Sequence, residues 1–132
     1  MIALDPRKQV SYVAKCDRKL PENEQVKFIL KAVSNKDEDV IKDSLFVKSG
    51  DTIRASMSNQ QAIAIHIGLV DVIGLKDSEG KDLTLTYEDA PNEWGIVEIK
   101  SEFITRIPSS IRTEIARVII DSLEPSEETR KN

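Results

Sequence analysis

Few residues in this sequence could do acid–base or metal chemistry, and they stand far apart. His66 is the only histidine, and isoleucines flank it on both sides. A catalytic triad needs further polar partners, and a zinc site needs further ligands at characteristic spacing. Neither accompanies His66 in the sequence. We interpret His66 as a hydrogen-bonded core or interface residue, and we expect no catalytic residue and no metal site.

The remaining candidates for chemistry are a short acidic run and a single thiol. Asp77, Glu79 and Asp82 resemble part of a calcium loop, but Gly80 comes too early for that loop, so the run predicts a turn. Cys16 is the only cysteine, which excludes an internal disulfide and a thiol-rich metal site. No glycine-rich phosphate-binding motif occurs. We expect no cofactor and no enzyme activity.

Composition and charge indicate an ordinary globular domain. The chain has 132 residues, enough for one domain with its own core, and a formal net charge of −4. That charge argues against a nucleic-acid-binding protein, which needs a cationic surface. The N-terminus does not resemble a signal peptide, and the apolar run at 62–70 is too short to span a membrane. We expect a cytoplasmic protein without a membrane partner.

The pattern of apolar residues predicts an α+β fold, with an N-terminal antiparallel β-strand pair packed with a small helical bundle. Alternation predicts strands at Gln9 to Lys15 and at Gln25 to Ala32, joined by a mobile polar loop. We place a single domain at residues 1–125 and a polar C-terminal tail at 126–132, after the helix-stopping Pro125.

Capping residues and helical spacing predict the helices. Ser34 caps a helix to Leu45, Gly50 is a stop signal, and the last helix begins after Pro108. A shorter helix is expected at Ser101 to Arg106.

The segment from Ser56 to Gly74 fits both the strand and the helix period, and we predict a helix because the run is long and Ser58 with Gln61 forms a capping box. The two longest helices should bury six residues together: Ile63, Ile67, Val70, Ile115, Val118 and Ile119.

The predicted binding surface is the N-terminal strand pair together with an aromatic loop. Lysines on the strand pair would orient a partner, and aromatic side chains would supply apolar contact if the core does not already use their face. Trp94, in a loop bounded by proline and glycine, is either a lid over the core or an interface anchor. The candidate partner-binding residues are Tyr12, Lys15, Lys27, Phe28, Lys31 and Trp94.

Three stretches resemble a family of small tailed-bacteriophage morphogenesis proteins. They are the Leu20-Pro21-Glu22-Asn23-Glu24-Gln25 run into a strand, the turn from Gly74 to Lys81, and the chain end from Ile107-Pro108 to Asn132. Some members of the family are similar to tail-assembly chaperones, and others are minor virion proteins. An aromatic that similar chains often carry near residues 70–73 is missing here.

The resemblance implies a non-enzymatic phage assembly protein that binds other phage structural proteins during tail assembly. The alternative is a structural component of the virion, in the tail or at the head–tail junction. A third class, an enzyme or ligand-binding domain, would need a deep polar pocket holding His66, Asp71 and another acid. The expected location is the host cytoplasm during assembly, or the virion itself. A homo-oligomer is compatible with either role.

Overall fold

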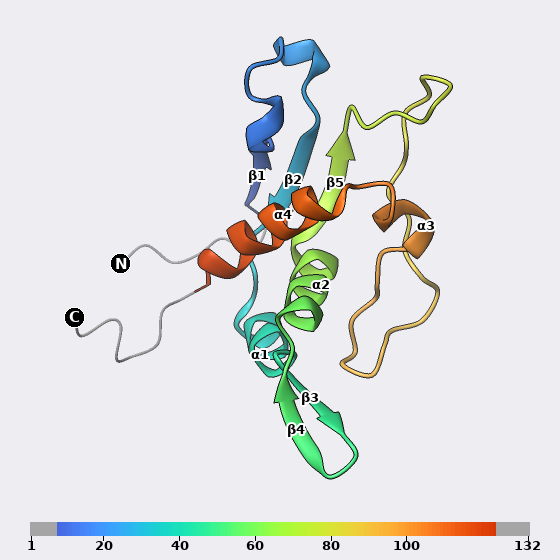
Figure 1. Cartoon of the computed structure of the whole chain (residues 1–132). Coiled ribbons are helices and arrows are strands. Elements are labelled where there is room, and N and C mark those ends of the chain that lie inside the picture. The colour runs from blue at the N-terminus through green and yellow to red at the C-terminus, as the bar shows by residue number, and fades with distance from the viewer. Residues whose placement is uncertain (1–7, 124–132) are drawn as a thin grey trace, which may run out of the picture.

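A three-stranded antiparallel sheet forms one side of the protein in the computed structural model, which describes residues 8–123 (Figure 1). The strands are β1 (Gln9–Tyr12), β2 (Lys27–Lys31) and β5 (Leu69–Ile73), with β2 in the centre. The predicted α+β class and the N-terminal antiparallel pair are confirmed. β1 is shorter than predicted, because the chain leaves the sheet after Tyr12 and turns into a 3₁₀ helix.

The connector between β1 and β2 is held by side chains, whereas we expected a mobile loop. It contains two 3₁₀ turns, Lys15–Asp17 and Glu22–Glu24. The backbone N–H of Val26 donates to the Asp17 carboxylate at 3.2 Å, and the Gln25 amide donates to the Leu20 carbonyl at 3.1 Å. These bonds satisfy backbone groups that a long loop would otherwise leave to water.

Helices α1 (Asn35–Asp43), α3 (Ser101–Ile104) and α4 (Ser109–Asp121) follow the predicted signals closely. The Ser34 hydroxyl caps α1 by accepting from the Asp37 N–H at 3.2 Å, and α4 begins directly after Pro108. The predicted stop at Pro125 and the tail at 126–132 lie outside the described residues.

The long helix predicted from Ser56 to Gly74 is wrong in its second half. Helix α2 spans Met57–Gly68, and the chain then continues directly into β5. The predicted Ser58–Gln61 capping box is also wrong, because Ser56 is the N-cap and accepts from the Asn59 N–H. The sequence did not show this boundary, because the apolar residues fit both the helix period and the strand period. A run that is buried on all sides does not favour either period.

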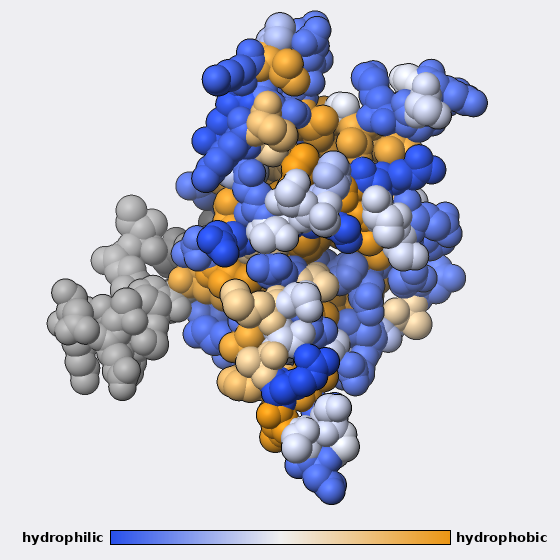
Figure 2. All heavy atoms as spheres, in the orientation of Figure 1, coloured by the Kyte–Doolittle hydropathy of each residue, from blue (hydrophilic) through white to orange (hydrophobic). Residues whose placement is uncertain are grey.

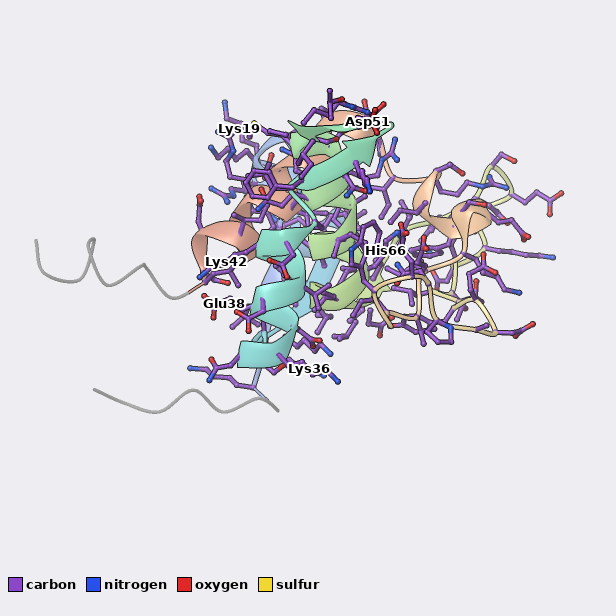
Figure 3. The ribbon with its side chains drawn as sticks, turned by 90° about the horizontal axis from the view of Figure 1, so that it is seen from below. Lys19, Lys36, Glu38, Lys42, Asp51 and His66 are labelled. Carbon is purple, nitrogen blue, oxygen red and sulfur yellow. The ribbon has the colours of Figure 1, made fainter. Side chains whose placement is uncertain are left out.

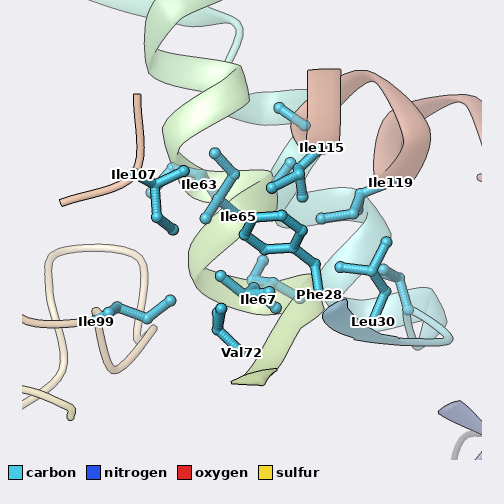
Figure 4. Packing of buried hydrophobic residues seen from close by; sticks show 14 of the residues in the cluster. Phe28, Leu30, Ile63, Ile65, Ile67, Val72, Ile99, Ile107, Ile115 and Ile119 are labelled. Carbon is cyan, nitrogen blue, oxygen red and sulfur yellow. The ribbon is translucent and has the colours of Figure 1, made fainter. Parts of the chain in front are cut away.

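The core lies between the sheet and the helices that cross it (Figure 4). Four of the six predicted core residues are buried, namely Ile63, Ile67, Ile115 and Ile119. Val118 is half-buried and packs against this core. Val70 is also half-buried, because it lies in β5 beside a register shift and not on a helix face.

Residues 75–100 form a long, mostly irregular segment with one well-defined turn. The Asp77 carboxylate accepts from the backbone N–H groups of Glu79 and Lys81, which confirms the predicted turn. Further along, Tyr87 bridges to Ile99, and the buried Ile99 side chain anchors the segment in the core. None of the helices within residues 8–123 has the length and apolar character needed to cross a membrane.

Candidate protein-binding surface

A β-hairpin that we did not predict projects from the body beside the ends of α1 and α2 (Figure 1). Its strands are β3 (Phe46–Ser49) and β4 (Thr52–Ala55), and they pair only with each other. Gly50 and Asp51 form a two-residue turn, in which Gly50 has a φ of +61°. This conformation suits a hairpin turn with glycine at its first central position.

One face of the hairpin carries apolar side chains that are open to solvent. Because directly paired residues point to the same side, Phe46 lies beside Ala55 and Ile53 lies beside Lys48 on one face. Phe46 is 58% exposed and Ile53 is 71% exposed. Figure 2 shows apolar atoms gathered on one side of the hairpin, next to a hydrophilic tip. We call Phe46, Ile53, Ala55 and the neighbouring Met57, which is 62% exposed, the hairpin patch.

The base of the hairpin is anchored to the body, although its strands are not covered. The Ser56 N–H donates to the Leu45 carbonyl at 2.6 Å, which extends the ladder by one pair. The Asn59 side chain donates to the Ser44 carbonyl at 2.6 Å and ties the start of α2 to the end of α1. A two-stranded ribbon is marginally stable by itself in water. The patch therefore lies on a ribbon that gains stability when another surface covers it.

The N-terminal strand pair is less available to a partner than we expected. Phe28 is only 2% exposed and belongs to the core, so its proposed role in partner contact is corrected. We expected this face of the strand pair to contact a partner only if the core did not use it. The core does use it, because α2 and α4 cover Phe28 and Leu30 (Figure 4). Lys27 and Lys31 are half-buried on the opposite face of the sheet, and Lys27 forms an ion pair with Glu22 at 3.2 Å.

Tyr12 is half-buried and contacts α4. Its hydroxyl donates to the Glu114 carboxylate at 2.5 Å, and the Lys15 backbone N–H donates to the same oxygen at 3.0 Å. The Arg18 guanidinium lies 5.5 Å from the centre of the Tyr12 ring. The Tyr12 hydrogen bond lowers the pKa of Glu114, and burial together with that bond raises the pKa of Tyr12. This cluster fastens β1 to α4, and the Lys15 side chain remains exposed.

Trp94 is half-buried and packs against the core, as a lid would. The Asn92 side chain accepts from the backbone N–H groups of Trp94 and Ile96, at 2.9 and 3.0 Å, and shapes this loop. The structure therefore brings Trp94 to the core, and not beside Tyr12 or Lys15 on a shared surface.

His66 points from α2 toward the segment that precedes α3 (Figure 3). The Ile99 backbone N–H donates to its Nδ1 at 2.9 Å, and a Glu98 carboxylate oxygen lies 3.5 Å from its Nε2. Burial lowers the pKa of His66, and the Glu98 charge opposes that shift. The expected role as a hydrogen-bonded residue is confirmed. Within residues 8–123 no group of three histidine, cysteine or carboxylate side chains is placed to hold a metal ion.

His66 also lines a surface cleft with a volume of about 470 Å³. The cleft lies between α1, α2 and residues 87–97, and Asp37 and Tyr87 contribute its other polar groups together with Lys31. Asp71, which we required for an enzyme site, does not line this cleft. We call this cleft the His66 cleft.

Comparisons with protein-family models, with curated proteins and with solved structures gave no match.

Proposed function

We propose that this protein is a non-enzymatic assembly factor that binds another protein through the β3–β4 hairpin. The observation that carries the proposal is the hairpin patch, a set of exposed apolar side chains on a two-stranded ribbon that is separate from the main sheet. Exposed apolar patches of this kind are typical of interaction sites.

The energetics of the patch favour a protein partner. Covering a Phe or Ile side chain yields about 1.5–3 kcal/mol for each side chain that becomes fully buried. Lys48 and Arg54 lie on the same ribbon and would orient the partner and speed its approach. The alternation of backbone hydrogen bonds leaves the outer backbone groups of Lys48 and Ile53 unpaired within the hairpin, so a partner strand could add to either edge.

The phage setting of the proposal rests on the sequence resemblance alone. In this setting the partner is another phage structural protein, which the chain binds in the host cytoplasm during tail assembly. The alternative role, as a component of the tail or of the head–tail junction, predicts that purified virions contain the chain. A chaperone would be absent from them, so protein analysis of purified virions separates the two roles.

The non-enzymatic part of the proposal is supported by the geometry at His66. Its Nδ1 accepts a backbone hydrogen bond, which leaves only Nε2 to face solvent or a ligand. In the neutral ring Nε2 carries the proton, and a protonated nitrogen cannot act as a general base.

A photoreactive amino acid at position 53 tests the hairpin directly. The chain would be produced in cells that also make the full set of virion proteins, with the same photoreactive group at position 81 as the matched control. Lys81 is exposed and lies in the turn after β5, at the opposite end of the molecule (Figure 1). We expect cross-links to a protein partner from position 53 and not from 81. Equal yields and identical products from both positions would contradict the proposal.

A further inference from the structure

We infer that a second copy of this chain is a partner of the hairpin, and that the hairpin of one copy seats in the His66 cleft of the next. The inference rests on the proposed function, because it names the partner of the same surface. Three observations carry it: the shape and lining of the cleft, the charges on the two surfaces, and their separation in the molecule.

The His66 cleft has apolar side chains at its surface that match the hairpin patch. Tyr87 and Val97 line the cleft and are 41% and 42% exposed, respectively. Half-buried Val70 and Ile96 continue the apolar lining toward the interior. A volume of about 470 Å³ is within the range of sites that enclose a ligand of several side-chain-sized groups. Phe46 and Ile53 are the largest exposed apolar side chains on the hairpin and would fill such a space.

The charges of the two surfaces are complementary. Residues 86–98, which border the cleft, contain four acidic side chains and no basic one: Glu88, Asp89, Glu93 and Glu98. Asp37 adds a further carboxylate to the lining and Lys31 adds one cation, so acidic side chains outnumber basic ones around the cleft. The hairpin, residues 46–55, carries two basic side chains, Lys48 and Arg54, and one acidic side chain, Asp51. Opposite charges around an apolar contact favour this pairing over a contact between two hairpins, in which like charges would meet.

The two surfaces belong to different parts of the chain, so each copy offers both of them. The hairpin lies at one end of α2, and the cleft is built from α1, α2 and the segment before α3. A contact between two unlike surfaces is heterologous, and it repeats from copy to copy. Such a contact produces a closed ring when the rotation between copies closes, and an open filament when it does not.

Two variants that each destroy one surface test the head-to-tail contact. Ile53→Glu places a charge in the hairpin patch and leaves the cleft intact. Val97→Arg places a bulky cation at the acidic cleft and leaves the hairpin intact. Leu20→Glu is the matched control, because Leu20 is another exposed apolar residue, 41% exposed, in the connector between β1 and β2. Circular dichroism checks the fold of each variant, and Phe46→Ser and Tyr87→Ser replace any variant that does not fold.

Sedimentation velocity of the full chain over a range of concentrations gives the result. We expect the wild type and Leu20→Glu to form species larger than dimers as concentration rises. Each surface variant alone should weaken association at least about tenfold, as the loss of a central interface residue does. An equimolar mixture of the two surface variants should form dimers and nothing larger, because only one intact hairpin–cleft pair remains in each complex.

Other outcomes overturn the inference. A mixture that stays monomeric excludes the hairpin–cleft pair. Association of Val97→Arg alone, as strong as that of the wild type, would indicate a contact between two hairpins. A wild type that is monomeric at every concentration also excludes the second copy as partner. In that case cross-links from position 53 to a different protein would still support the proposed function, so the two failures are distinguishable.

Discussion

At the scale of single residues, His66 is a structural side chain whose protonation opposes folding. It accepts a hydrogen bond from the Ile99 N–H through Nδ1, and protonation of that nitrogen would break the bond. Burial keeps the pKa of His66 below its ordinary value of 6.5, while the nearby Glu98 charge raises it in part. The unfolded chain therefore binds a proton at a higher pH than the folded chain does.

The free energy of unfolding should consequently fall as the pH falls below 6.5 toward the lowered pKa, and it should keep its full value above 6.5. The loss is about 1.4 kcal/mol for each unit by which folding lowers the pKa. His66→Asn keeps an acceptor for the Ile99 N–H but cannot titrate, so it should lack this part of the slope. Because His66 is the only histidine, urea unfolding of both proteins between pH 5 and 8 isolates its effect. Parallel curves would show that His66 is not held neutral by the fold.

Tyr12 is the second residue whose role can be tested singly. Its hydroxyl bonds to Glu114 and joins β1 to α4. Tyr12→Phe removes the hydrogen bond and keeps the ring, so it should lower the free energy of unfolding by about 1 kcal/mol at pH 7. The pKa of the Glu114 carboxyl is lowered in the fold from 4.5, so its contribution to stability is present above pH 4.5 and is lost as the pH falls further. The difference between Tyr12→Phe and wild type should shrink in acid, and a constant difference would contradict the link to Glu114.

At the scale of elements, the packing of α2 against α4 depends on Gly68. A Cβ at this position would lie 2.7 Å from Ile119 Cδ1, inside the core. Gly68→Ala should therefore destabilise the protein by about 1–3 kcal/mol, as overpacked cores do. Ile119→Val removes the atom in closest conflict, so the double variant should lose less stability than the sum of the two single losses. Additive losses in thermal unfolding would show that Gly68 does not contact Ile119.

The hairpin should be dispensable for folding of the body. Leu45 and Ser56 are already joined by a backbone hydrogen bond, so residues 46–55 can be replaced by a two-residue Asn-Gly turn without moving either end. We expect the melting temperature to change by less than about 4 °C. In contrast, Ile115→Ala truncates a fully buried side chain and should cost about 2–5 kcal/mol. Unfolding of the hairpin-less chain would mean that the ribbon is part of the fold.

Elements with clear end signals could be predicted from the sequence, and the others could not. Ser34 and Pro108 mark the starts of α1 and α4, and the structure agrees with both. At the boundary between α2 and β5, Gly68 lies close to Ile119, which is far away along the chain, and no local pattern in the sequence shows such a contact.

The hairpin did have a local signal, which we interpreted otherwise. Gly50-Asp51 is a residue pair typical of a two-residue hairpin turn, and the run that follows it, Thr52 to Ala55, alternates between polar and apolar residues. Gly50 also fits the end of the preceding helix, and we chose that interpretation. The candidate site was missed for this reason, and the N-terminal strand pair was favoured although the core uses one of its faces.

At the scale of the whole molecule, the body and the hairpin have separate roles. The body buries a continuous core between the sheet and the helices, and the hairpin presents apolar side chains away from it. The central claim is that the hairpin is needed for binding to a partner and is not needed for folding of the body. A variant without the hairpin therefore tests function while the body still folds.

In the phage setting that we propose, particle yield from a phage that carries the hairpin-less gene tests this claim most directly. The control carries Lys81→Glu, a charge change on an exposed turn outside the hairpin. Circular dichroism and the amount of soluble chain would confirm that both variants are folded and present. The account predicts a loss of assembled particles for the hairpin-less chain and a normal yield for Lys81→Glu. A normal yield of particles from the hairpin-less chain would contradict it.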